Sequence, residues 1–162
     1  MNPKSIKRIV VATDFSELSG NTVETAITLA RDWSATLDLV HVAAEAAYPM
    51  PPPMDVVTLP LDLAAVVRDT SARLDAEKEL VRARGVTCEG SVLVGRPDTV
   101  IVKHADETRA DLIVLGTHGR HGIGHALLGS VAEKVVQHAH CPVLTIPVHA
   151  PGAAASATSP NR

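Results

Sequence analysis

Aromatic side chains are almost missing from this chain, because Phe15, Trp33 and Tyr48 make up only 2% of its 162 residues. A core with so few rings must be built from aliphatic residues, and 46% of the sequence is hydrophobic. Surfaces that bind single-stranded nucleic acids stack several bases on several rings, so the composition excludes that class. The net charge of −3 leaves no general excess of basic residues for a phosphate backbone. We therefore expect no nucleic-acid partner.

Cysteines and long apolar runs are also scarce. The two cysteines, Cys88 and Cys141, lie far apart and form no metal-binding pair, so we expect reduced thiols. No segment approaches the roughly 18 uninterrupted apolar residues that a membrane span requires. The N-terminal residues do not have the pattern of a secretory signal. These absences predict a cytoplasmic protein that does not associate with membranes.

Short apolar runs alternate with amphipathic segments along most of the chain. The runs are typical of buried parallel strands and cover residues 6–12, 37–42, 86–94, 111–116 and 142–147. The helices predicted between them end near Trp33, span residues 61–84, run from Pro97 to about Arg109, and span residues 130–139. This order predicts the α/β class, as one doubly wound sandwich with a five-stranded parallel sheet and helices on both faces.

Two segments fall outside this alternation. Residues 48–60 contain five prolines and are expected to form an exposed loop. Residues 149–162 are rich in Ala, Ser, Thr and Pro and have little to bury, so we expect a disordered tail. Residues 1–148 are then predicted to form a single domain.

The loop at residues 116–130 is rich in glycine and histidine. It lacks the Gly-Lys-Ser/Thr ending of a Walker A loop, and Leu127 stands where a dinucleotide fingerprint needs its third glycine. Its glycines permit close backbone approach to a ligand, and Gly129 and Ser130 open a helix whose free N–H groups suit a phosphate. Arg120 and the neighbouring histidines would add positive charge. The alternative is a flexible connector that binds nothing.

Two helix starts have a second interpretation that needs no ligand. Asp14 and Glu17 fit a capping box, with Ser16 as the competing N-cap residue. Ser130 and Glu133 fit another capping box. Asp14 is therefore either a helix cap or a carboxylate that accepts hydrogen bonds from ribose hydroxyls.

The histidines do not indicate a metal site built by the protein. His118, His121 and His125 are close in sequence but lack the spacing and acidic partners of known metal motifs. We expect His118 to order the loop through hydrogen bonds rather than to act in catalysis. Any Mg²⁺ would be carried by ligand phosphates, which this ion prefers to cages made only of protein groups.

The spacing Gly116, two residues, Gly119, nine residues, Gly129-Ser130 resembles the nucleotide-binding signature of the universal stress protein family. Similarity to the family's strands and turns extends through residues 9–17, 39–42, 94–97 and 140–144, and covers roughly residues 4–148. The resemblance implies a sheet of order 3-2-1-4-5, ATP as ligand, and a homodimer formed through the last strand, residues 142–147.

The resemblance also implies a set of nucleotide-binding residues. Those expected at the adenine and ribose end are Ala12, Thr13, Asp14 and Val42. Those expected at the ribose and phosphates are Gly116, Gly119, Gly129, Ser130 and Val131, and the loop residues Thr117, His118 and Arg120 complete the predicted site. Ala12 departs from the family pattern, because many nucleotide-binding members have proline at that position.

Three functions remain open from the sequence. The leading interpretation is a nucleotide-dependent regulatory protein of the stress response that binds ATP. The second is a slow ATPase or nucleotidyl-transfer enzyme, for which His118, Arg120 and His121 supply candidate groups without compelling an assignment. The third is an interaction module that works without a ligand. We expect no dedicated catalytic residue.

Overall fold

The computed structural model describes residues 5–43, 63–117 and 128–147, and these residues form alternating strands and helices. In chain order the elements are β1 (Arg8–Ala12), α1 (Glu17–Trp33), β2 (Thr36–Ala43), α2 (Leu63–Arg82), β3 (Cys88–Val94), α3 (Pro97–Glu107), β4 (Leu112–Gly116), α4 (Ser130–His138) and β5 (Val143–Ile146). Every predicted element is present with the predicted type, and the ends differ by a few residues at most.

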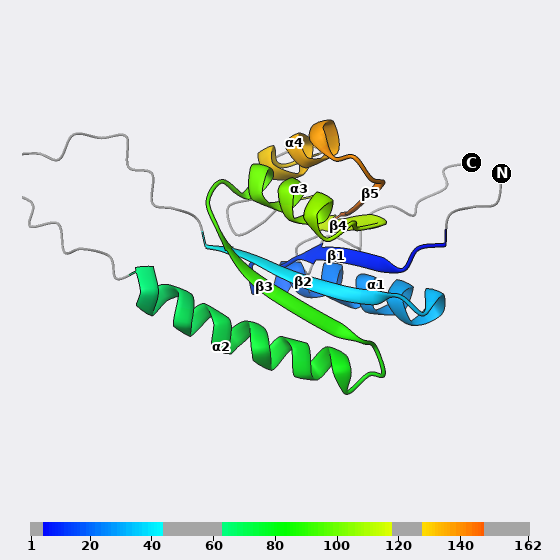
Figure 1. Ribbon diagram of the computed structural model, residues 1–162, viewed down its shortest axis with the longest axis horizontal. Coiled ribbons are helices and arrows are strands. Elements are labelled where there is room, and N and C mark those ends of the chain that lie inside the picture. Colours follow the sequence, from blue (N-terminus) through cyan, green and yellow to red (C-terminus); the bar gives the residue numbers. More distant parts are fainter. Residues whose placement is uncertain (1–4, 44–62, 118–127, 148–162) are drawn as a thin grey trace, which may run out of the picture.

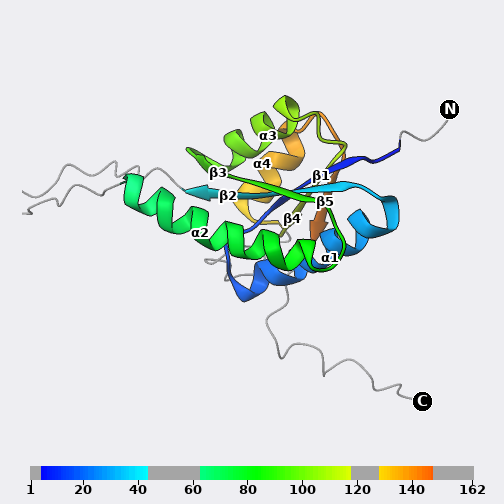
Figure 2. The same cartoon turned by 60° about the horizontal axis from the view of Figure 1, so that its bottom comes forward.

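The strands form one parallel sheet of order β3-β2-β1-β4-β5. β1 lies at its centre, so that Val10 pairs with Asp38 of β2 on one side and Ile113 of β4 on the other. Helices α1 and α2 cover one face, and α3 and α4 cover the opposite face (Figures 1 and 2). The predicted doubly wound α/β sandwich and its sheet order are confirmed.

Each face of the sheet has its own aliphatic core. Because successive side chains of a strand point to opposite faces, Ile9 and Val11 of β1 pack toward α1 and α2, whereas Val10 packs toward α3 and α4. All three side chains are fully buried. The described part of both cores consists of Val, Leu, Ile and Ala with Cys88, as the scarcity of aromatic residues predicts.

The starts of α1 and α4 differ from the capping boxes that the sequence suggested. Ser16 is the N-cap of α1, and its Oγ accepts the Ser19 N–H at 3.2 Å. Gly129 is the N-cap of α4, and its carbonyl accepts the Glu133 N–H at 2.9 Å. Both capping-box interpretations are therefore wrong: Asp14 precedes the cap by two residues, and Ser130 already lies inside the helix.

Both cysteines are free thiols. Cys88 is buried under α2, and burial raises the pKa of its thiol to about 11. Such a thiol is almost entirely protonated near neutral pH and is a poor nucleophile. Cys88 therefore acts as a small core residue, as the sequence suggested, while Cys141 is partly exposed.

Two predicted features lie outside the described residues. These are the proline-rich loop at residues 48–60 and the tail at residues 149–162, which stay predictions. Among the helices of the described segments, none combines the length and the apolar character needed to cross a membrane.

A buried hydrogen bond ties the sheet to α3. Asp38 of β2 is 2% exposed, and one of its carboxylate oxygens lies 2.9 Å from Nε2 of His104. Arg8 approaches the same oxygen at 3.6 Å and pairs with Glu89 at 2.6 Å. A buried carboxylate needs such partners, because an unpaired buried charge is strongly destabilising.

We predict that His104→Ala lowers the free energy of unfolding by about 2 kcal/mol, because Asp38 loses its closest partner. Chemical denaturation measures the change. His138→Ala is the matched control, since His138 is exposed and bonds only the Lys134 carbonyl of its own helix among the contacts described. Equal losses in the two variants would contradict a structural role for the buried pair.

Candidate functional site

Two loops meet where the winding of the sheet reverses. β1 and β4 are neighbours, but the chain leaves β1 into α1 on one face and leaves β4 toward α4 on the other. In open α/β sheets, ligands bind in the crevice at this switch point, beyond the carboxyl ends of the strands. The residues after β1 and those on either side of residues 118–127 therefore form the candidate site.

A backbone hydrogen bond joins the two described ends of the glycine loop. The Gly129 N–H donates to the Thr117 carbonyl at 2.7 Å, and the Thr117 N–H donates to the Ile146 carbonyl of β5 at 2.9 Å. Gly116, Thr117, Gly129 and Ser130 are therefore gathered at one place. His118, Gly119 and Arg120 lie outside the described residues, and their roles stay predictions.

The N-cap residue of α4 makes no side-chain hydrogen bond to the first turn of the helix. This residue is Gly129, which has no side chain to accept a hydrogen bond from the helix N–H groups. A nine-residue helix that begins without such a cap presents backbone donors and a partial positive charge at its N-terminus. These are the groups that hold phosphate at the start of a helix.

Aliphatic side chains lie beside this helix start. Ala12 at the end of β1, Val42 near the end of β2, and Leu128 and Val131 around the start of α4 are all partly buried against the α3/α4 core. Their partial exposure leaves apolar surface near the carboxyl edge of the sheet. A flat apolar ring such as adenine fits a surface of this chemistry. Leu128 was not recognised from the sequence as part of this surface.

Thr13 and Asp14 hold the loop after β1 in shape. The Thr13 N–H donates to the Val40 carbonyl at 2.9 Å, its carbonyl lies 2.9 Å from Nδ1 of His41, and its hydroxyl accepts the Phe15 N–H at 3.1 Å. Oδ1 of Asp14 accepts both the N–H and the hydroxyl of Ser16, at 3.0 and 2.5 Å. Thr13 thus has its backbone and side chain engaged within the protein, which favours a supporting role.

Phe15 adopts a strained conformation next to these residues. Its φ of 59° is in the left-handed region, which costs a residue with a side chain about 1–2 kcal/mol. The ring stacks on His41 with centroids 4.4 Å apart, and the Arg73 guanidinium carbon lies 4.6 Å from its centroid. An aromatic pair and a cation–π contact contribute about 0.5–1.5 and 0.5–1 kcal/mol, enough to offset the strain.

Glu77 joins Arg73 beneath the same loop. Burial raises the pKa of the Glu77 carboxyl, and the nearby Asp14 charge raises it further, while Arg73 and a hydrogen bond from Thr13 oppose the shift. Its Oε2 atom is buried with no hydrogen-bond partner among the described residues. Arg73 and Glu77 were not recognised as part of the site from sequence. Their spacing of four residues puts them on one face of α2, but it cannot show which loop that face reaches.

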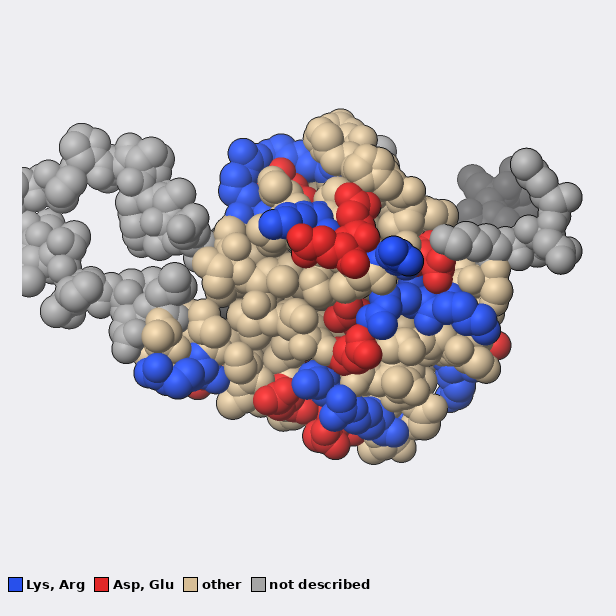
Figure 3. All heavy atoms as spheres, in the orientation of Figure 1, with Lys and Arg blue, Asp and Glu red and all other residues tan. Residues whose placement is uncertain are grey.

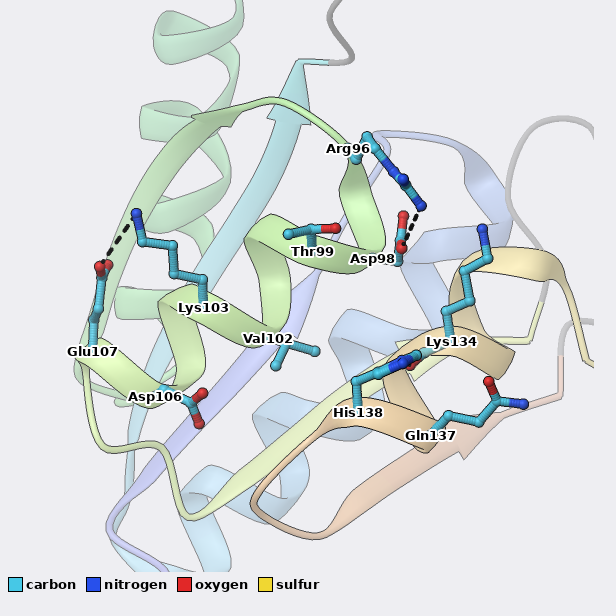
Figure 4. Close-up of a pocket in the computed structure, with 10 residues that line it drawn as sticks. All are labelled: Arg96, Asp98, Thr99, Val102, Lys103, Asp106, Glu107, Lys134, Gln137 and His138. Carbon is cyan, nitrogen blue, oxygen red and sulfur yellow. Dashed lines mark hydrogen bonds and ion pairs between the residues drawn. The ribbon is translucent and has the colours of Figure 1, made fainter.

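A separate hollow lies between α3 and α4. It has a volume of about 610 Å³, and Figure 4 shows Val102 inside it and charged side chains around it. Arg96 pairs with Asp98 at 3.1 Å and Lys103 with Glu107 at 3.6 Å, so much of this charge is neutralised. None of the predicted nucleotide-binding residues lines the hollow. It is therefore not part of the candidate site.

Charge on the visible surface is mixed. On the face shown in Figure 3, basic and acidic side chains are interspersed over α2 and α3, and no broad patch of one sign forms there. Among the described residues, no three His, Cys, Asp or Glu side chains are grouped so that they could hold a metal ion. The face shown in Figure 3 therefore offers no general basic surface to an anionic ligand.

The five-stranded parallel sheet of this order, with helices on both faces, defines the doubly wound α/β class. The sequence profile described as the universal stress protein family matches residues 5–147. The chain belongs to this family. Universal stress protein MJ0531 of Methanocaldococcus jannaschii is 34% identical over 140 residues, which cover 86% of this chain and 81% of that protein.

Solved structures of the family share the fold. The protein UspA from Lactobacillus plantarum aligns with a TM-score of 0.75 and 26% identity over 89% of this chain and 99% of that one. A universal stress protein in complex with cAMP gives 0.68 and 28%, over 90% and 99% of the two chains. The Archaeoglobus fulgidus protein in complex with dAMP gives 0.61 and 25%, over 87% and 98%.

Proposed function

We propose that this protein binds ATP and acts as a nucleotide-dependent regulatory protein of the stress response. The main support is the start of α4, where backbone donors without a side-chain cap are held at the switch point by the Gly129–Thr117 bond. The relatives described as complexes with cAMP and dAMP make an adenine nucleotide the natural ligand class. Mg²⁺ would arrive with the phosphates, which supply its preferred oxygen ligands.

The proposed site divides between base and phosphates. Adenine would lie on the aliphatic surface of Ala12, Val42 and Val131, and Asp14 would face the ribose. Gly116, Gly119, Gly129 and Ser130 would surround the phosphates through backbone N–H groups and the Ser130 hydroxyl, with Thr117, His118 and Arg120 completing the loop. With no aromatic ring stacked on the base, recognition would depend on shape and backbone hydrogen bonds.

Isothermal titration calorimetry with ATP and Mg²⁺ tests the ligand directly. We expect one site per chain with a Kd tighter than about 1 mM, which corresponds to roughly −4 kcal/mol. AMP and cAMP test whether the base and ribose suffice, and GTP serves as the control for base selectivity. Absence of any heat of binding with ATP at millimolar concentration would falsify the proposed function.

Gly129→Asp should separate helix stability from ligand binding. An aspartate at the N-cap accepts hydrogen bonds from the first turn and complements the helix dipole, so the melting temperature should stay the same or rise. The same carboxylate would occupy the anion position and repel phosphate, so ATP affinity should fall at least about tenfold.

Thr87→Asp is the matched control for this prediction. It adds the same charge at an exposed position just before β3, at the opposite edge of the sheet. It should leave ATP affinity unchanged. If Gly129→Asp binds ATP as the parent protein does, the start of α4 does not hold the phosphates.

We also propose a homodimer formed through residues 142–147. β5 lies at the edge of the sheet, so one side of its backbone is not paired with another strand of the sheet, and Leu144 is 36% exposed. Sedimentation equilibrium should give twice the chain mass of 17.0 kDa. Leu144→Lys should shift the protein toward monomer by placing a charge in the interface. A monomeric parent protein would contradict this proposal.

A further inference from the structure

The face of α2 that touches the loop after β1 carries two charged side chains in succession. Arg73 approaches the ring of Phe15 at 4.6 Å from its centroid. Glu77, one turn further along the helix, has a buried Oε2 atom and lies close enough to Thr13, Asp14 and Arg73 for all three to affect its pKa. Leu74, between them in sequence, is buried in the α1/α2 core and fixes this part of the helix against the sheet.

These contacts lie on the opposite face of the sheet from the proposed adenine surface. Phe15 packs against the α1/α2 core, whereas Ala12, Val42 and Val131 pack against the α3/α4 core. The loop of residues 13–15 passes between the two faces at the end of β1. Contacts that hold Thr13 and Phe15 on the α1/α2 side of the sheet therefore also affect the position of Asp14, which lies between them in sequence.

We propose that Arg73 and Glu77 are positioning residues of the nucleotide site, and that they act through Phe15 and Thr13 to hold Asp14 in its binding conformation. This inference rests on the proposed function. Neither residue is expected to touch the nucleotide. The left-handed conformation of Phe15 supports the inference, since such strain persists only where surrounding contacts enforce it.

The charge of Glu77 is central to this arrangement. An ionised Glu77 attracts Arg73 from the same helix and is repelled by the Asp14 carboxylate. From β2, His41 also contacts this loop: its ring stacks on Phe15, and its Nδ1 atom lies 2.9 Å from the Thr13 carbonyl. Because the pKa of Glu77 is raised, acidification would protonate it sooner than an exposed glutamate and weaken its hold on Arg73.

The arrangement also links α2 to the ligand. If the position of α2 affects ATP affinity, then by reciprocity ATP must affect α2 by the same factor. α2 is thus the element through which occupancy of the site would be detected elsewhere on the surface.

Arg73→Gln and Glu77→Gln test the inference, with Glu79→Gln as the matched control on the same helix. Glu79 is exposed and pairs with Arg82 at 2.7 Å, away from the loop. Without ATP, hydrogen exchange of the amides of residues 14–16 should be faster in the first two variants and unchanged in the control. With ATP, the affinity of each of these two should fall about three- to fivefold, as expected when one such contact is lost.

The pH profile provides a measurement that a general loss of stability would not change. The ATP affinity of the parent protein is divided by that of Glu77→Gln at each pH. The pH dependence that comes from ATP itself and from the groups that both proteins share then cancels. This ratio should be largest at pH 8, where Glu77 is ionised. It should approach one as the pH falls through the raised pKa of Glu77, because the protonated side chain then resembles glutamine.

The outcomes separate the two proposals. If the parent protein binds no ATP, the proposed function fails and this inference, which depends on it, fails too. If the parent binds ATP but Arg73→Gln and Glu77→Gln match Glu79→Gln in exchange and affinity, the proposed function stands and only the positioning role is overturned. If both variants bind ATP more weakly but the ratio of parent to Glu77→Gln affinity does not change with pH, the positioning role of Arg73 is retained and the role of the Glu77 charge is overturned.

Discussion

The central position of β1 is the constraint on which the rest of the molecule depends. β1 hydrogen-bonds to β2 on one side and β4 on the other, while the chain leaves β1 and β4 toward opposite faces. The crevice follows from this divergence, since no helix connection can cover the gap between the two strand ends. Its two sides then differ in chemistry: the start of α4 and an aliphatic surface on one, and a loop stacked on charged residues of α2 on the other.

In the proposed site, backbone groups would do what side chains do in other phosphate sites. The N-cap position of α4 is a glycine, so the N-cap residue itself offers no side-chain acceptor to the first N–H groups of the helix. The chain is mildly acidic overall, and the charges on the face shown in Figure 3 are mixed. A polyphosphate would therefore be attracted by a local array of donors rather than by a basic field, and the aliphatic neighbours would contribute the apolar part of the binding energy.

The sequence predicted the α/β class and the elements well, because buried strands and amphipathic helices leave strong periodic patterns. It was less successful at helix starts: of the two candidates for α1 the cap is Ser16 rather than Asp14, and α4 is capped by Gly129 rather than Ser130. Neighbouring polar residues satisfy the same spacing, and backbone geometry decides among them. Contacts over long separations, such as Asp38 with His104 or Arg73 with Phe15, leave no pattern in a single sequence, because they depend on how the faces pack.

The most direct measurement is a titration of isotope-labelled protein with ATP and Mg²⁺, followed by NMR chemical shifts of backbone amides and methyl groups. We predict the largest changes at Ala12, Val42, Gly129 and Val131, with smaller changes reaching α2 around Arg73 and Glu77. Val102 and Lys134, which line the hollow between α3 and α4, should remain unchanged. Changes centred on that hollow, or no changes at millimolar ATP, would contradict the account.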